Sequence, residues 1–191
     1  MTMNSIFLIF TKRLSQAMGF TPSFAIALPN HYNWIILSIS ICIYLVFTLT
    51  FGLMTGFLHW DVCQEKRTIV KTIATTLIAP AFLEETFFRA LLLPYPSDKI
   101  ALDSYIAWAT FSLLLFIIYH PLNALTFFSQ GRATFFNPVF LGLATSLGII
   151  CTTAYWQTGS LWLPVIIHWL TVVIWLLCFS GLTRLKINSL I

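Results

Sequence analysis

The sequence of 191 residues is dominated by apolar side chains: 59% are hydrophobic, only 8% are charged, and the mean hydropathy is +0.89. Soluble domains carry about 25% charged residues, so this composition excludes an ordinary soluble protein and indicates an integral, multi-pass membrane protein whose main partner is the lipid bilayer. The net charge of +4 accompanies no basic stripe with interleaved aromatic residues, so nucleic-acid binding is not expected.

The N-terminal segment, residues 1–33, differs from the rest of the chain. Its apolar stretch Ile6–Phe10 is short and is followed by Lys12 and Arg13, the reverse of the basic-then-apolar order of a signal peptide. We expect this segment to lie at the membrane interface, and residues 34–191 to form one membrane-embedded helical domain.

Long uncharged stretches predict the membrane-spanning helices, each of which needs about 20 apolar residues. The polar tetrad Gln157-Thr158-Gly159-Ser160 divides the longest of these stretches into a helical hairpin. The predicted fold is therefore all-α, a polytopic membrane bundle of about five helices. Their expected ranges are Trp34–Leu58, Ile69–Leu93, a helix that starts at Ser104 and meets Pro121 late in its course, Phe136–Tyr155 and Leu161–Leu182.

The second of these helices is unusual, because only twelve residues separate Lys71 from Glu84. A helix that crosses the membrane here must include Glu84, Glu85 and Arg89 and end at the Pro94-Tyr95-Pro96 motif. Ionised groups at bilayer depth cost at least ~2.5 kcal/mol each, so such residues are rare and usually functional. The sequence therefore predicts the functional site on this helix.

Helical spacing assigns different roles to the two acids. Glu85 and Arg89 are four residues apart and should pair, whereas Glu84 is rotated away from both. A carboxylate without a fixed cationic partner can accept and return a proton, so Glu84 is the expected general base. The alternative is that the three residues form a buried ionic cluster that only holds helices together.

Two histidines, His120 and His168, lie in other apolar segments. With Glu84 they place two imidazoles and one carboxylate on three different helices. Such a set can bind zinc or can activate a water molecule without metal, and both arrangements are hydrolytic. We expect the three side chains to converge in a polar cavity.

Three ordered motifs carry a family resemblance: Glu84-Glu85-x-x-x-Arg89, Phe116-x-x-x-His120, and His168 before the last apolar helix. They resemble the CAAX protease and bacteriocin-processing family of intramembrane glutamic or metallo-endopeptidases, which includes the type II CAAX prenyl endopeptidases. The resemblance implies a hydrolase that cuts a membrane-bound protein or peptide, with Glu84, Glu85, Arg89, His120 and His168 as site residues. It also implies zinc as a cofactor held by Glu84, His120 and His168, although metal-free catalysis by glutamate stays open.

One position departs from that pattern. Prenyl-protein members carry a polar residue four positions after the last histidine, where this chain has Val172. A valine side chain donates no hydrogen bond, so the side chain of Asn123 or Thr171 would have to supply the missing donor. Two other classes of function also stay open: a non-catalytic adaptor or immunity protein of the same fold, and a proton- or ion-coupled transporter.

Overall fold

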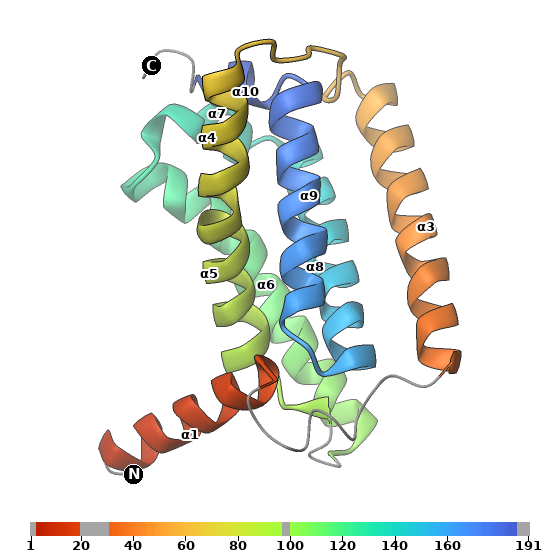
Figure 1. Cartoon of the computed structure of the whole chain (residues 1–191), viewed down its shortest axis with the longest axis vertical. Helices are drawn as coiled ribbons and strands as arrows, with labels where there is room; N and C mark the ends of the chain where they lie inside the picture. Colours follow the sequence, from red (N-terminus) through yellow and green to blue (C-terminus); the bar gives the residue numbers. More distant parts are fainter. Residues whose placement is uncertain (1–2, 20–30, 97–99, 187–191) are drawn as a thin grey trace.

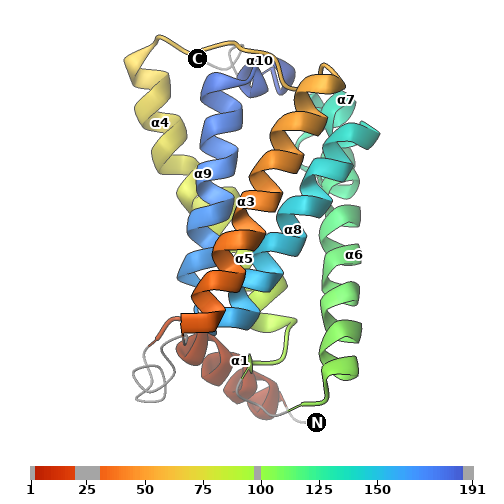
Figure 2. The same ribbon diagram turned by 90° about the vertical axis from the view of Figure 1, so that its right-hand side faces the viewer.

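The computed structural model describes residues 3–19, 31–96 and 100–186, and within these ranges the chain forms helices and connecting segments without a strand. The long helices run side by side along the longest axis, and α1 crosses one end of the bundle (Figures 1 and 2). The predicted all-α membrane bundle is confirmed. Its elements are α1 (Met3–Ala17), α3 (His31–Met54), α4 (Lys66–Thr76), η1 (Leu77–Phe82), α5 (Leu83–Glu85), η2 (Thr86–Leu91), α6 (Leu102–Thr126), η4 (Ser129–Gly131), α7 (Arg132–Phe135), α8 (Pro138–Thr158), α9 (Trp162–Cys178) and α10 (Gly181–Arg184).

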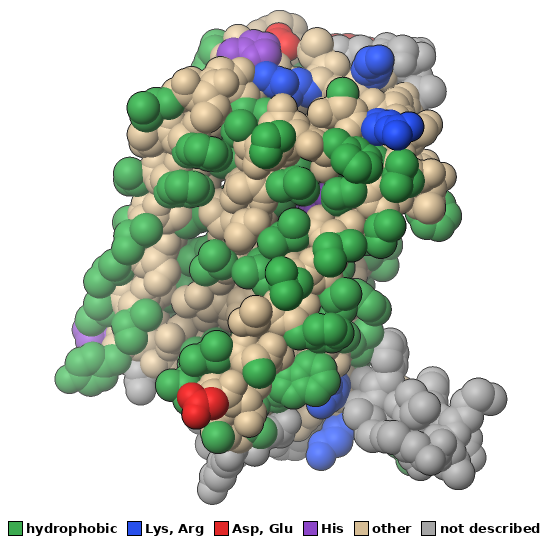
Figure 3. Space-filling model, turned by 180° about the vertical axis from the view of Figure 1, so that it is seen from behind, with side chains coloured by type: hydrophobic (Ala, Val, Ile, Leu, Met, Phe, Trp, Pro, Cys, Tyr) green, Lys and Arg blue, Asp and Glu red, His purple; other side chains and the backbone are tan. Residues whose placement is uncertain are grey.

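Among the described residues, three helices, α3, α6 and α8, are long and apolar enough to cross a membrane, and α9 is a shorter apolar helix of 17 residues. Hydrophobic side chains cover the middle of the face shown in Figure 3, while the Lys, Arg, Asp and Glu side chains lie near its two ends. A bilayer places its hydrocarbon against such a middle zone and water against both ends. The surface thus suits a lipid environment.

The acidic segment is not the uninterrupted helix Ile69–Leu93 that we predicted. Ala79 has φ −133° and ψ 118°, so helical geometry breaks immediately before Pro80, inside the π-helical segment η1, and a second π-helical segment, η2, follows. Proline lacks a backbone N–H and disfavours the helical region for the residue before it, which explains the extended Ala79. The segment still continues to Leu91 and ends before Pro94, as expected.

The α8–α9 hairpin forms at the predicted polar break. Asn137 caps α8 by accepting hydrogen bonds from the backbone N–H groups of Val139 and Phe140, and Gly159 ends it in the left-handed region, at φ 64°. The last helix is shorter than the predicted Leu161–Leu182. It ends at Cys178, because the following Phe179 and Ser180 leave helical geometry and the chain turns back into α10.

Helix α1 is attached to the end of the bundle by hydrogen bonds from two directions. The guanidinium of Arg13 donates to the carbonyl oxygen of Leu91 at the end of η2, and the backbone N–H of Leu161 donates to the carbonyl oxygen of Ala17. Part of the predicted interfacial segment, residues 1–2 and 20–30, lies outside the described residues. The interfacial role of residues 1–33 and the domain boundary at 34 stay predictions.

Candidate active site

Glu85 stands at the centre of the buried polar groups. One carboxylate oxygen, Oε2, lies 3.0 Å from Nε of Arg89, and the other, Oε1, lies 2.7 Å from Nδ1 of His168. The carboxylate is fully buried and Arg89 is almost so. The predicted pairing of Glu85 with Arg89 is therefore confirmed, and the same carboxylate also reaches α9.

Arg89 holds three parts of the bundle together. Besides its ion pair with Glu85, its Nη2 donates a hydrogen bond of 3.0 Å to the carbonyl oxygen of Gly148 on α8. Its guanidinium carbon lies 5.0 Å from the ring centroid of Phe116 on α6, which is within cation–π range. A buried cation with these contacts ties the acidic segment to α6 and α8.

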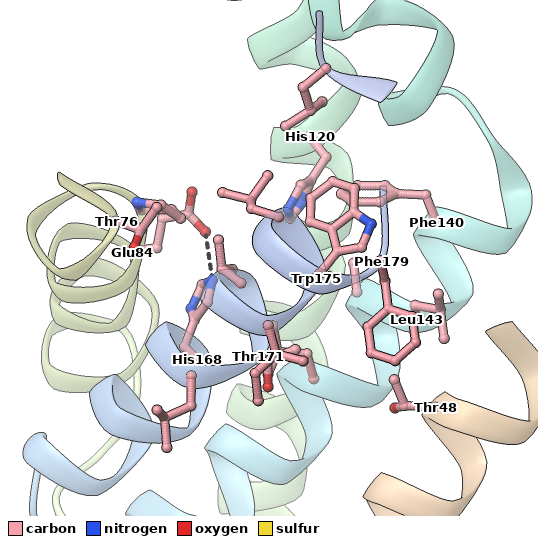
Figure 4. A pocket seen from close by; sticks show the side chains of 18 of the residues that line it. Thr48, Thr76, Glu84, His120, Phe140, Leu143, His168, Thr171, Trp175 and Phe179 are labelled. Atoms are coloured by element: carbon pink, nitrogen blue, oxygen red, sulfur yellow. Dashed lines mark ion pairs between the residues drawn. The ribbon is translucent and has the colours of Figure 1, made fainter. Parts of the chain in front are cut away.

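His168 lies between the two acids and contacts them with different ring nitrogens. Nδ1 faces Glu85, and Nε2 lies 3.9 Å from Oε2 of Glu84, the contact drawn as a dashed line in Figure 4. A carboxylate oxygen beside Nδ1 requires a proton on that nitrogen. In the neutral imidazole, Nε2 therefore carries a lone pair that points toward Glu84 and the cavity.

His120 repeats this arrangement on α6. Its Nδ1 lies 2.8 Å from the carbonyl oxygen of Phe116, one turn earlier, so that nitrogen must donate and Nε2 of the neutral ring carries the lone pair. Helix α6 continues through Pro121 to Thr126, as the placement of His120 inside a helix requires. His120 is buried.

Glu84, His120 and His168 all line one cavity of about 970 Å³, as predicted, and Figure 4 shows them at one side of it. Oε2 of Glu84 is buried and accepts no hydrogen bond from the described residues. The expected polar character of the cavity is wrong, because most of its wall is apolar. Many of these apolar side chains come from α3, α8 and α9, such as Leu45, Leu143 and Leu170.

A family model, type II CAAX prenyl endopeptidase Rce1-like, matches residues 66–174. This match covers more than half of the chain and includes all five predicted site residues. The chain belongs to this family. The family is one of membrane-embedded CAAX proteases, and the resemblance inferred from the motifs is confirmed. No curated protein and no solved structure matches the chain.

Zinc was expected on Glu84, His120 and His168, and their chemistry is suitable in one respect. Both imidazoles present a free Nε2 while a partner fixes Nδ1, which is how metal-bound histidines are commonly oriented. The geometry is less suitable, because the described residues contain no group of three or more His, Cys, Asp or Glu side chains arranged to hold a metal ion. Zinc stays a prediction, and if bound it would polarise the substrate carbonyl or its attacking water.

Several site contacts were not predicted. The carbonyl of Gly148 is a backbone group, and nothing in the sequence identifies it as a partner of Arg89. Thr171, considered as a substitute donor, already donates to the carbonyl of Ile167. Asn123 and Val172 both line the cavity, as does Tyr119, which we had not considered although it precedes His120 directly.

Proposed function

We propose that this member of the family is an intramembrane endopeptidase in which Glu84 activates water to hydrolyse a peptide bond of a membrane-associated protein or peptide. The observation that carries the proposal is the pair formed by Glu84 and His168 at the edge of the cavity. Their facing atoms, Oε2 and Nε2, are 3.9 Å apart, too far for a direct hydrogen bond. Polar atoms at such a separation commonly share a water molecule.

The proposed chemistry needs only the residues of this chain and one water. Glu84 takes a proton from the water, and the hydroxide oxygen bonds to the carbonyl carbon while the π electron pair moves onto the carbonyl oxygen. Collapse of this tetrahedral intermediate breaks the C–N bond, and the leaving nitrogen receives the proton held by Glu84. The products are one carboxylic acid and one amine, and Glu84 returns to its starting state.

The other buried groups are proposed to position this base. Glu85 fixes the ring of His168 through Nδ1, and Arg89 compensates the charge of Glu85. Glu84 accepts one O–H group of the water, and Nε2 of either His168 or His120 can accept the other, which orients a lone pair of the water toward the substrate. This division of roles follows the general rule that catalytic groups are held by a surrounding shell of fixed contacts.

The apolar wall of the cavity favours a substrate that carries apolar surface next to the scissile bond. Two probes cover this class: a quenched fluorescent peptide with a C-terminal S-farnesyl cysteine motif, and an unlipidated peptide with an apolar transmembrane segment. We propose both kinds of substrate, prenylated and unlipidated, because this chain has Val172 where the prenyl-protein members carry a polar residue.

The test uses purified full-length protein in proteoliposomes and mass spectrometry of released fragments. Wild type is expected to cleave one or both probes, and Glu84→Gln is expected to abolish cleavage while the protein remains folded. Glu65→Gln is the matched control, since Glu65 is an exposed carboxylate that accepts a hydrogen bond from the hydroxyl of Thr68 at the same helix end and does not line the cavity. Cleavage that persists in Glu84→Gln would exclude Glu84 as the base.

A non-catalytic adaptor is the second candidate, and Val172 in the cavity wall is the observation that favours it. An adaptor would bind a membrane peptide in the cavity without turnover. Wild type that binds both probes but releases no fragment would support the adaptor and contradict the peptidase.

A further inference from the structure

Peptide hydrolysis places a negative charge on the former carbonyl oxygen, and enzymes stabilise this oxyanion with hydrogen-bond donors. In their neutral form, His120 and His168 do not supply one. Nδ1 of His120 and Nδ1 of His168 donate to Phe116 and Glu85, which leaves both Nε2 atoms without a proton in the neutral rings. Val172, also in the cavity wall, has no donor. The donor must therefore come from another side chain of the cavity, an inference that rests on the proposed peptidase function.

Most hydroxyl groups on the cavity wall already use their proton. The hydroxyls of three threonines donate to backbone carbonyls of their own helices, and because the proton of Thr171 is used in this way, the phenol of Tyr44 must donate to Thr171 at 3.0 Å. The three threonine bonds run from Thr75 to Lys71, from Thr76 to Thr72 and from Thr171 to Ile167. Four other side-chain donors line the wall, and of these Thr48 and Trp175 are buried without a hydrogen-bond partner among the described residues; the other two are Tyr119 and Asn123.

Position separates these four donors. Thr48 lies on α3, across the cavity from Glu84 (Figure 4), and the indole of Trp175 packs against Phe57 and Phe140. Tyr119 precedes His120 directly on α6 and lines the same cavity as Glu84. Its ring centroid lies 5.9 Å from that of Phe88 and 5.8 Å from that of His120, so aromatic packing restricts the ring. Asn123 lies three residues, almost one turn, beyond His120 on α6.

We propose that Tyr119 is a catalytic residue whose O–H donates a hydrogen bond to the oxyanion formed when the water activated by Glu84 attacks the peptide carbonyl. The proton stays on the tyrosine oxygen throughout, so no bond to Tyr119 forms or breaks. The phenol would take the role of hydrogen-bond donor that a polar residue at the position of Val172 would have in prenyl-protein members. This hydrogen bond stabilises the transition state more than the bound substrate, because the carbonyl oxygen becomes charged only when the water attacks.

The test compares steady-state kinetics of Tyr119→Phe with wild type, on whichever of the two probe peptides wild type cleaves. This substitution removes one hydroxyl and keeps the ring, so the fold should be retained. We expect kcat to fall about 10²- to 10³-fold, the usual loss for one oxyanion donor, with KM changed less than about threefold. Tyr32→Phe is the matched control, because Tyr32 is 74% exposed on the first turn of α3 and distant from the cavity wall.

The second measurement is the affinity for a phosphinic peptide with the sequence of the cleaved probe, which carries a tetrahedral anionic centre in place of the scissile bond. Tyr119→Phe is expected to weaken its binding by a factor similar to the loss in kcat/KM, as for any group that acts on the transition state. A kcat within threefold of wild type, or a loss of kcat with unchanged phosphinic-peptide affinity, overturns the proposal. So does a loss that appears in Asn123→Ala and not in Tyr119→Phe. If wild type cleaves no more than Glu84→Gln, the peptidase function itself fails.

Discussion

Glu85 and His168 share a hydrogen bond of 2.7 Å between Oε1 and Nδ1, although they are 83 residues apart in the chain. This bond joins the acidic pair to the last apolar helix and sets which nitrogen of His168 faces Glu84. Adjacent acids in the sequence thus contact the same imidazole from two sides. Glu85 holds the ring, and Glu84 faces its free nitrogen across 3.9 Å.

The two acids should respond differently to the same substitution. Glu85→Gln removes the charge that compensates the buried Arg89, and stranding a buried ion typically costs about 3 to 5 kcal/mol of stability. Glu84→Gln removes no fixed ion pair with a permanent cation, so its thermal stability should stay near that of wild type while cleavage is lost. Thermal unfolding of both variants in detergent measures this difference. Equal destabilisation of the two would indicate a purely structural ionic cluster.

His168 offers a sharper separation, because each of its nitrogens has its own partner. In His168→Asn the amide nitrogen can occupy the place of Nδ1 and keep the bond to Glu85, whereas in His168→Gln the amide reaches toward the place of Nε2. Both variants should lose at least about 100-fold in activity, within the range for groups that assist proton transfer.

Stability should distinguish these two histidine variants. His168→Asn is expected to unfold near the wild-type temperature. His168→Gln leaves a buried carboxylate oxygen without its donor, which costs about 1 to 3 kcal/mol. Thermal unfolding monitored by circular dichroism gives the comparison, and the reverse order of stability would mean that the assigned tautomer of His168 is wrong.

Arg89→Lys tests whether geometry or charge matters at the buried cation. Arg89 contacts Glu85 through Nε and Gly148 through Nη2 from one planar group, and a lysine ammonium cannot reproduce both contacts from one point. We expect a loss of about 1 to 3 kcal/mol, smaller than that of Glu85→Gln. Thermal unfolding of the two variants side by side measures the order, and full stability of Arg89→Lys would show that charge alone suffices.

Local rules were sufficient for the features that depend on spacing along one helix. The separation of four residues predicted the ion pair between Glu85 and Arg89, and the lengths of apolar stretches predicted the main helices. Pro80 was visible in the sequence and should have indicated the break at Ala79. The remaining errors concern tertiary packing: the carbonyl of Gly148 and the apolar cavity wall depend on which helix faces reach one another, and periodicity does not encode this.

The last prediction separates zinc catalysis from direct catalysis by glutamate. Catalytic zinc commonly has three protein ligands and one water, and Glu84, His120 and His168 supply the ligand types from three separate elements. To bind zinc they would have to move closer together than in this structure, since no group of three such side chains among the described residues is arranged for a metal. Zinc binding should then rigidify the site and raise the unfolding temperature, an effect readable without any substrate.

Elemental analysis of chelator-washed protein, combined with the cleavage assay, decides between the two forms of catalysis. Direct catalysis predicts full activity below about 0.1 metal ion per chain and no change in unfolding temperature on adding zinc. Zinc catalysis predicts that activity is lost on chelation and returns with Zn²⁺ or Co²⁺. His120→Ala then serves as the comparison: it should abolish the zinc-induced rise in unfolding temperature if His120 is a ligand, and should leave metal content unchanged if His120 only orients water.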